Sequence, residues 1–391
     1  MNAPPPGVNK NSNPLTRARL SGREATHMNR HRLSLITAAA LAFVLAALSF
    51  ACVQQPSANS GSANATGAAR KTGKVRIGLS MDTLKEERWQ RDRDLFVARA
   101  KELGAEVVVQ SANGDDRAQT QQADNLLTQD IDALVVIPHN GEIAASIVEA
   151  AKRKGVPVVS YDRLIRNSEP DLYISFDNER VGELQARYLF DRAPKGNYIL
   201  VGGAPTDNNA QLLRKGQMNV LKAAIDRHDI NVLTDQFAKD WLASEALRIT
   251  EDALTKSAGD VVAVVASNDA TAGGAVSALD EKKLAGKVLV SGQDADLAAL
   301  QRIVAGTQTM TVYKPVHLLA RKAAEAAVAL ARGERPDAPA RINNGKIDVP
   351  SILLEPVVVD KSNIMETVVK DGYQKADAVY EAVPADQRPK Q

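Results

Sequence analysis

The chain has 391 residues, which is enough for two domains with a substantial hydrophobic core. Its formal net charge of +2 is unevenly spread, because residues 1–70 carry seven Lys or Arg and one Glu, a net +6, which leaves −4 for the rest. A slightly acidic globular part offers no electrostatic footprint for nucleic acid, so we expect no nucleic-acid partner.

Residues 28–52 have the pattern of an export signal. A compact basic segment, 28–32, precedes an uncharged apolar run, 33–53, in which small residues stand near the end at cleavage-site spacing. An uncleaved membrane anchor is the alternative, because the run is long. Residues 1–27 are expected to be a non-native or disordered extension, with Met28 the better start, and residues 53–73 a flexible tether.

Cys52 is the only cysteine, which excludes an intramolecular disulfide and a cysteine metal site. It directly follows the apolar run, where bacterial lipoproteins carry their acylated cysteine. The match departs from the usual pattern at Ser49 and Phe50, where Leu and a small residue are preferred. We expect lipidation at Cys52, with plain cleavage at the same bond as the alternative. The protein is then exported, to the periplasm or the outer face of the cytoplasmic membrane.

From residue 74 onward, strand-like and helix-like segments alternate. Nearly continuous β-branched and Leu content predicts strands that are buried on both faces, as in a parallel sheet. These strands are expected at 75–81, 106–110, 133–137, 156–161 and 172–176. Helical periods lie between them, and Gly104 and Gly155 stand where a helix ends. The first half of the chain is therefore predicted to be an α/β unit.

The same alternation restarts after residue 178. The second set of strands is predicted at 198–201, 232–237, 261–266, 288–291 and 309–312. A helix over 316–331 and a last strand over 352–359 follow. Two series of similar length predict two similar lobes, and the short tail is expected to add elements back onto both.

Five polar clusters come directly after predicted strands, at 87–89, 161–163, 207–209, 267–269 and 292–294. Because the carboxyl ends of parallel strands line the ligand crevice, all five are expected at one edge. They contain carboxylates, carboxamides and guanidinium groups, which form paired hydrogen bonds. Trp89 and Trp241 are the two tryptophans, and an indole packs well on the C–H face of a sugar ring. The pattern indicates a site for a small neutral molecule with many hydroxyls.

The motifs around these clusters resemble those of a known family. They are Glu87-Arg88-Trp89-Gln90, Tyr161-Asp162-Arg163, Ile174-Ser175-Phe176-Asp177-Asn178-Glu179, Asp207-Asn208-Asn209-Ala210, Ala-Ser-Asn-Asp-Ala-Thr-Ala-Gly-Gly at 266–274, Ser-Gly-Gln-Asp-Ala-Asp at 291–296, and Ala-Gly-Thr-Gln-Thr-Met-Thr-Val-Tyr-Lys-Pro at 305–315. Over residues 75 to 373 the chain is similar to the D-xylose-binding family of bacterial ABC sugar importers, among the type I periplasmic binding proteins.

The resemblance implies an α/β fold of two Rossmann-like lobes, each a parallel sheet flanked by helices, joined by three hinge crossovers. The crossovers are expected near 176–178, 310–313 and 341–345. The first lobe is then 74–177 with 314–342, the second is 178–313 with 343–380, and 381–391 is a disordered tail.

Carried over position by position, the resemblance also implies a site. Its hydrogen-bonding residues are Arg88, Asp162, Arg163, Asp207, Asn209, Asn268, Asp294 and Lys314. Trp241 stacks on the sugar, and Trp89 lies on its other face. Asp269 is expected to cap the following helix, and Asp296 to begin another. The implied ligand is D-xylose or a related monosaccharide, and the implied partners are an ABC permease and its ATPase, with the protein itself a monomer.

Each residue also has an ordinary interpretation, such as a surface ion pair for Asp162 and Arg163 or a core position for Trp241. Because all five clusters are expected at the same edge of the sheets, ordinary structural roles for all of these residues are disfavoured. Catalytic motifs are missing, including G-x-G-x-x-G, a Walker loop and G-x-S-x-G, and the five His lack metal spacing. We therefore expect no enzyme and no cofactor. Glycoside hydrolysis by Asp294 and Asp296 is disfavoured by their surroundings.

Three other interpretations use the same fold. Sugar-responsive repressors carry a helix-turn-helix at the N-terminus, where this chain has an export signal. An envelope sensor subunit that feeds a chemoreceptor or sensor kinase, or a binding protein for another pentose, stays open as an alternative.

Overall fold

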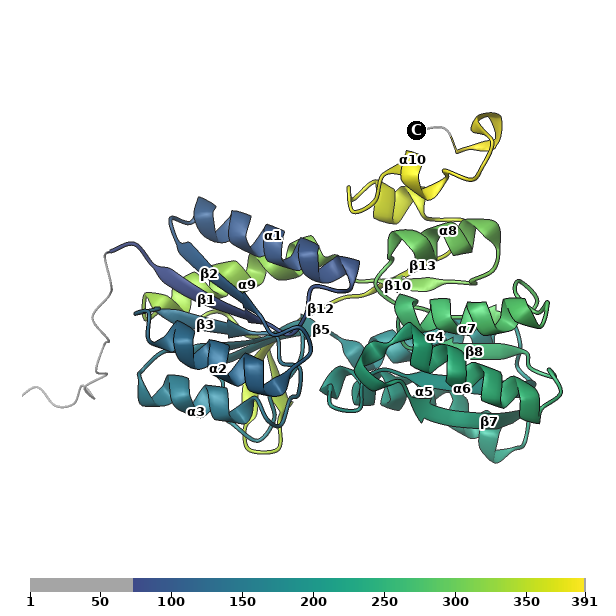
Figure 1. Cartoon of the computed structure of the whole chain (residues 1–391), viewed down its shortest axis with the longest axis horizontal. Coiled ribbons are helices and arrows are strands. Elements are labelled where there is room, and N and C mark those ends of the chain that lie inside the picture. Colours follow the sequence, from purple (N-terminus) through teal and green to yellow (C-terminus); the bar gives the residue numbers. More distant parts are fainter. Residues whose placement is uncertain (1–72, 390–391) are drawn as a thin grey trace, which may run out of the picture. The chain divides into compact units, whose positions relative to one another are not determined.

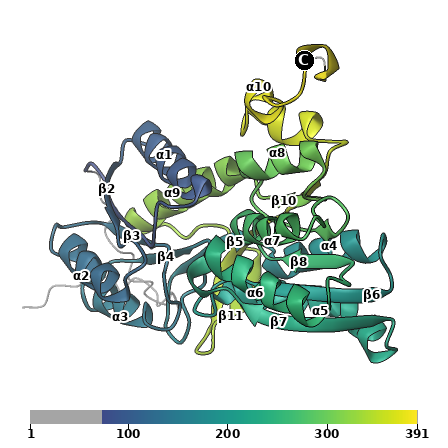
Figure 2. The ribbon, with the colours of Figure 1, turned by 45° about the vertical axis from the view of Figure 1, so that its right-hand side comes forward.

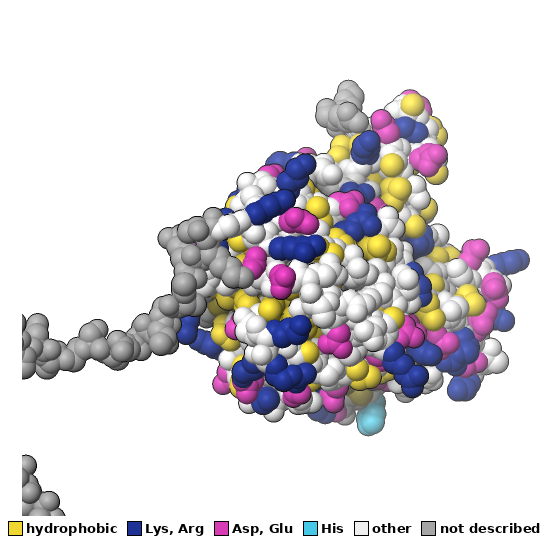
Figure 3. Space-filling model, turned by 60° about the vertical axis from the view of Figure 1, so that its left-hand side comes forward, with side chains coloured by type: hydrophobic (Ala, Val, Ile, Leu, Met, Phe, Trp, Pro, Cys, Tyr) yellow, Lys and Arg dark blue, Asp and Glu magenta, His cyan; other side chains and the backbone are white. Residues whose placement is uncertain are grey.

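The computed structural model describes residues 73–389, which contain two lobes built on separate sheets (Figure 1). The predicted export signal, Cys52 and nearly all of the predicted tether lie outside these residues. Within residues 73–389, no helix has the length and apolar character needed to cross a membrane. On the face shown in Figure 3, basic and acidic side chains are interspersed.

The first lobe is a seven-stranded sheet in the order β11-β12-β5-β4-β3-β1-β2. Its strands are β1 (Arg76–Met81), β2 (Glu106–Ser111), β3 (Ala133–Val136), β4 (Val158–Tyr161), β5 (Leu172–Phe176), β11 (Ala340–Asn343) and β12 (Asp348–Leu354). All neighbours pair in parallel except β11, which runs antiparallel to β12. The central strands are buried almost throughout, as their continuous apolar runs predict.

Helices cover both faces of this sheet (Figure 1). On one face lie α1 (Glu87–Glu102) and α9 (Val316–Ala331), and on the other α2 (Asp116–Leu127) and α3 (Ala145–Arg153). The period of two along β3 decides the division, since Val135 packs with α1 and α9 while Leu134 and Val136 pack with α2 and α3.

The second lobe is a four-stranded parallel sheet in the order β7-β6-β8-β9. Its strands are β6 (Gly196–Gly202), β7 (Ile230–Phe237), β8 (Ala263–Ala266) and β9 (Leu289–Val290). The helices α4 (Asn178–Phe190) and α5 (Asn208–Asp226) pack on one face, and α6 (Ala243–Lys256) and α7 (Asp269–Glu281) on the other. Beside it lie α8 (Leu297–Ala305) and a small antiparallel pair, β10 (Thr311–Tyr313) and β13 (Val357–Val359).

The chain passes between the lobes three times, after β5, after β10 and after β12. The third crossover was expected near 341–345, with 343–380 in the second lobe, and this expectation is wrong. Residues 351–354 of β12 pair in parallel with residues 173–176 of β5, so the first lobe continues to Leu354. The strand predicted over 352–359 is in fact two strands in different sheets, divided at Pro356, which has no N–H to donate.

After β13 the chain packs back onto the second lobe, beside α8 (Figures 1 and 2). Short elements form this segment: a π-helix, η2 (Met365–Val369), then α10 (Ala376–Val379) and a 3-10 turn, η3 (Ala385–Gln387). The tail was expected to be disordered from residue 381. Instead the Arg388 side chain donates hydrogen bonds to the carbonyls of Glu381 and Val383, which folds its described part back on itself.

Candidate functional site

The ten predicted site residues all line one cavity, at the carboxyl ends of the strands of both lobes. About 340 Å³ of space between these residues is not filled by protein atoms, and part of it is open to solvent. Its lining is Glu86, Arg88, Trp89, Asp162, Arg163, Asp207, Asn209, Trp241, Asn268, Gln293, Asp294 and Lys314. The topology accounts for this convergence, because each cluster stands in the turn, or at the start of the helix, that follows a parallel strand.

Arg88 is the centre of one ion-pair cluster. It is 2% exposed, and its guanidinium lies 2.9 Å from Asp162 Oδ2, 3.3 Å from Asp294 Oδ1 and 3.2 Å from Asp92 Oδ2. The Lys314 ammonium lies 3.4 Å from Asp294 Oδ1. Burial opposes ionisation of Asp162, yet the charges of Arg88 and Lys314 outweigh it and lower its pKa. Since Asp294 belongs to the second lobe, this cluster spans both lobes.

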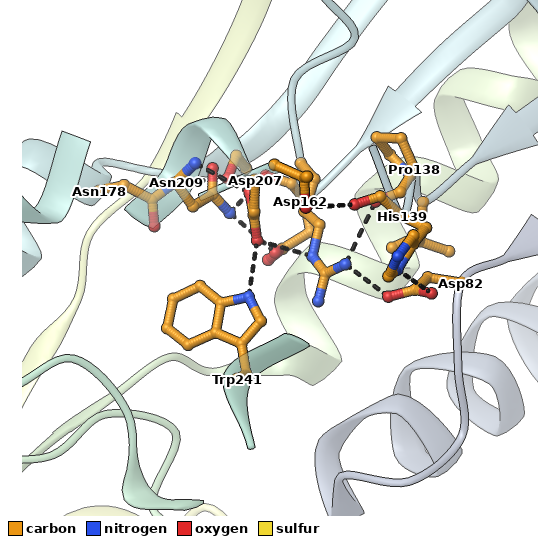
Figure 4. Close-up of polar contacts among 12 residues, drawn as sticks. Asp82, Pro138, His139, Asp162, Asn178, Asp207, Asn209 and Trp241 are labelled. Atoms are coloured by element: carbon orange, nitrogen blue, oxygen red, sulfur yellow. Dashed lines mark hydrogen bonds and ion pairs between the residues drawn. The ribbon is translucent and has the colours of Figure 1, made fainter. Parts of the chain in front are cut away.

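Arg163 is the centre of a second cluster, and its partners Asp82 and Asp207 are labelled in Figure 4. Its Nη1 lies 2.6 Å from Asp82 Oδ2, and its Nε lies 2.8 Å from Asp207 Oδ2 in the second lobe. Asp82 also pairs with His139, whose Nδ1 lies 2.9 Å from Asp82 Oδ1. Burial works against the Asp82 carboxylate, but the His139 hydrogen bond and the Arg163 charge lower its pKa. Burial raises the pKa of Asp207, although Arg163 opposes this.

A direct hydrogen bond also joins the lobes beside these clusters. Asn209 Nδ2 donates to the main-chain oxygen and to Oδ1 of Asp162, at 3.1 Å each. The polar groups of one lobe therefore form hydrogen bonds with those of the other lobe beside the cavity. A small ligand in this cavity would face charged groups from both lobes at once.

The two indoles are held by polar neighbours. The Arg88 guanidinium carbon lies 4.2 Å from the centroid of the Trp89 ring, a cation–π distance. Trp241 Nε1 donates to Asp207 Oδ2 at 3.2 Å (Figure 4). Both side chains are almost fully buried and line the cavity. They supply flat apolar surfaces among the charges.

The backbone that carries Trp241 is unusual. Asp240 has a φ of +51° and Trp241 a φ of +58°, so two successive residues with side chains adopt the left-handed conformation. Such positions are costly and cluster at functional sites. The indole lies so close to Gly203 that a Cβ there would overlap the ring. The strained turn at Asp240 and Trp241 therefore sets the direction of the indole, and the absence of a side chain at Gly203 leaves room for the ring.

One predicted role is wrong. Asp269 was expected to cap α7, but the structure has Asn268 as the cap, with its Oδ1 accepting from Thr271 N at 2.9 Å in a capping box. Asn268 still lines the cavity, and within the described residues its amide nitrogen has no hydrogen-bond partner. Asp269 is instead buried in a network behind the cavity.

Sequence reasoning missed several residues. Glu86 and Gln293 line the cavity although they were not in the predicted set; Gln293 directly precedes Asp294, and Glu86 stands two residues before Arg88. Burial raises the pKa of Glu86. Asp92 could have been found, because it lies one turn after Arg88 on α1. No pattern pointed to His139, which meets Asp82 only through the fold.

The donor set does not suit a metal. In the part of the chain that the structure describes, no group of three or more His, Cys, Asp or Glu is arranged to hold a metal ion. The cavity offers carboxylates, guanidiniums, an ammonium and amides around two indoles. These groups donate and accept hydrogen bonds in fixed directions, which is what a polyhydroxylated ligand requires.

Comparison with known proteins agrees with this geometry. Residues 77–335 match the model of the periplasmic binding protein domain. The chain belongs to the periplasmic binding protein family. It is 56% identical, over 78% of its length and 92% of the relative's, to the D-xylose-binding periplasmic protein of Haemophilus influenzae. It is 54% identical to the protein of the same name from Escherichia coli, over 79% of this chain and 94% of that protein.

A solved structure supports the same assignment. The carbohydrate transporter solute binding protein of Chloroflexus aurantiacus, in complex with D-glucose, is 32% identical with a TM-score of 0.75, covering 78% of this chain and 98% of that one. The predicted fold class is thereby confirmed. As a periplasmic binding protein the chain is a solute-binding protein and not an enzyme, whereas lipid anchoring through Cys52 stays a prediction.

Proposed function

We propose that this protein captures D-xylose in the cavity between its lobes and delivers it to the permease of an ABC importer, which an ATPase drives. The observation that supports this most is the convergence of all ten predicted sugar contacts on one cavity. The names of its two relatives with 54–56% identity specify the same sugar. The protein acts as a monomer in this proposal, and a chemoreceptor or sensor kinase is a further candidate partner.

The chemistry of the cavity supports a sugar. A hydroxyl can donate to a carboxylate and accept from a cation at the same time. Arg88 and Lys314 lie beside Asp162 and Asp294, so a hydroxyl placed among them finds both kinds of partner. Because these groups are buried, leaving one without a partner is costly, and each selects the direction of a hydroxyl.

Closure follows from the same contacts. A sugar that touches both lobes favours the closed arrangement by its differential affinity for it. The pairs Arg163–Asp207 and Arg88–Asp294 already join the lobes, so ligand and protein contacts act in the same direction. The permease is then presented with the closed form.

We expect D-xylose to bind more tightly than ribose, arabinose and glucose. An epimer places one hydroxyl on the wrong side and leaves a buried charged partner unpaired, which costs about 1–3 kcal/mol, or roughly 5- to 150-fold in affinity. Glucose keeps the ring hydroxyls of xylose and adds a hydroxymethyl group, so it should be the strongest competitor.

Calorimetric titration of the purified protein with the four sugars tests this order. Asp296→Ala serves as a control beside Asp294→Ala, because Asp294 lines the cavity and Asp296 does not. Ribose or arabinose binding as tightly as xylose would refute the ligand while leaving sugar capture intact.

We also propose that the mature chain begins at a lipidated Cys52, on the sequence pattern alone. The mass of the intact protein extracted from the cell envelope is expected to equal that of a diacylated or triacylated chain starting at Cys52. An unmodified Cys52 would indicate a soluble form, and a product that retains residues 33–50 would contradict both.

A further inference from the structure

We infer that Asp269 is a positioning residue for the solute site, acting through Asp294 and Lys314 without lining the cavity. This inference rests on the proposed function, because it concerns how the sugar contacts are held. Asp269 is 1% exposed and opens α7, next to Asn268. The residues that line the cavity do not include it.

The Asp269 carboxylate accepts hydrogen bonds from three residues of two segments. Its Oδ1 accepts from Gln308 Nε2 at 2.9 Å, and its Oδ2 accepts from Thr311 Oγ1 at 3.0 Å and from the main-chain N–H of Asp296 at 3.0 Å. Its own N–H donates to the carbonyl of Gln293 at 3.0 Å. One side chain thus fastens the turn after β9 and the strand β10 to the start of α7.

Both fastened segments carry cavity residues. The turn after β9 holds Asp294, and β10 leads directly into Lys314. In that turn Asp294 has a φ of +99° and Ala295 a φ of +57°, both in the left-handed region. A turn with two such residues persists only where its surroundings hold it. The N–H of Asp296 donates to Asp269 Oδ2, and the main-chain nitrogen of Ala295 lies 3.4 Å from Thr311 Oγ1.

The turn after β9 also packs closely against the Asp269 carboxylate. A Cβ at Gly292 would overlap Asp269 Oδ1, so the glycine lets the turn approach the carboxylate closely. The position of Asp294 is therefore set relative to Asp269 by contact on one side and by hydrogen bonds on the other.

Asparagine cannot replace this carboxylate without losing a bond. Its NH2 group would face a donor in either orientation: Gln308 Nε2 on one side, or the N–H of Asp296 on the other. Gln308 cannot turn its amide over to help, because its Oε1 accepts from Arg302 Nε at 2.9 Å and its Nε2 also donates to the Met310 carbonyl at 3.2 Å. The site needs two acceptor oxygens, which aspartate supplies and asparagine does not.

The test is a double-mutant cycle on xylose affinity. Asp269→Asn should weaken binding about tenfold and narrow the difference between xylose and arabinose, because Asp294 and Lys314 are no longer held in place. Asp294→Asn should weaken binding on its own. The double variant should lose much less than the product of the two single losses, since one residue acts through the other.

Two further variants separate positioning from general stability. Thr250→Val removes a buried hydroxyl of the same lobe that donates to Ala246 O at 2.7 Å, so it should lower the melting temperature and leave affinity unchanged. Thr311→Val removes one of the hydrogen bonds to Asp269, so it should also lower the affinity for xylose. This variant replaces Asp269→Asn in the test if the Asp269→Asn protein does not fold.

The outcomes are distinct. A folded Asp269→Asn protein with unchanged affinity and sugar preference, or losses that simply multiply in the cycle, would overturn this inference alone. Wild-type protein that binds none of the four sugars would overturn the proposed function and this inference with it.

Discussion

Replacing Arg88 with Met is expected to lower the free energy of unfolding by about 3–5 kcal/mol and to abolish measurable sugar binding. The guanidinium is buried and pairs with Asp92, Asp162 and Asp294. Removing it leaves three carboxylates in the interior, and the Lys314 ammonium, at 3.4 Å from Asp294 and 4.0 Å from Asp162, does not replace its three ion pairs. The cost of uncompensated buried charge then far exceeds the loss of the hydrogen bonds themselves.

Chemical denaturation of wild type and Arg88→Met at pH 7 measures this effect. Arg93→Met is the matched control, because Arg93 is on the same helix but pairs only with the exposed neighbour Asp94, and it should change stability by less than about 1 kcal/mol. A folded Arg88→Met protein as stable as the Arg93→Met control would show that the buried cluster is not held by Arg88.

The difference in the free energy of unfolding between wild type and Arg88→Met should depend on pH, which gives a second check. Burial works against the Asp162 carboxylate, but the Arg88 charge lowers its folded-state pKa, so this stabilisation is present above the unfolded pKa near 3.9 and is lost as the pH falls below it. Burial raises the pKa of Asp92 to about 6 although the Arg88 charge lowers it, so removing Arg88 raises this pKa further and the carboxyl group of the variant is protonated at a higher pH than in wild type. The gap between wild type and Arg88→Met should therefore shrink as the pH is lowered from 7 towards 4.

Some elements could be predicted to the residue, and the reason is physical. The strand Leu172–Phe176 and the helix Val316–Ala331 have the predicted bounds. Each has an unbroken apolar pattern with a change of character at both ends. By contrast, residues 352–359 were predicted as one strand but form two, separated by Glu355 and Pro356, because Leu354 pairs with Phe176 and Val357 pairs with Tyr313. Apolar content reports burial, whereas the choice of sheet depends on which partner strand is within reach.

The same distinction holds for the site. Its residues could be predicted because parallel strands bring their carboxyl ends to one edge, and this depends only on the order of strands and turns. The choice of helix cap between Asn268 and Asp269 could not be predicted, since both residue types are good helix caps and they stand at successive positions. His139 was invisible because its partner Asp82 follows another strand, and no spacing rule links the two.

Truncating Trp241 to Ala is expected to weaken xylose binding by about 2 kcal/mol or more, which is roughly thirtyfold. The indole is 7% exposed, lines the cavity and is oriented by Asp207. Trp241→Phe keeps an aromatic face but loses the hydrogen bond to Asp207, so its affinity for xylose should lie between those of wild type and Trp241→Ala. Calorimetric titration measures all three proteins, and a folded Trp241→Ala protein that binds xylose as tightly as wild type would exclude stacking as a source of affinity.

Gly203→Ala should reproduce this loss without any change to the tryptophan. The added Cβ would overlap the indole and push it from its place over the cavity. The decisive comparison is with the double variant Gly203→Ala/Trp241→Ala, in which the methyl group enters the space that the indole has left. If the glycine matters only because it supports the indole, the double variant should bind no more weakly than Trp241→Ala alone. A further loss in the double variant would mean that Gly203 acts on the sugar by another route, such as the conformation of the turn after β6.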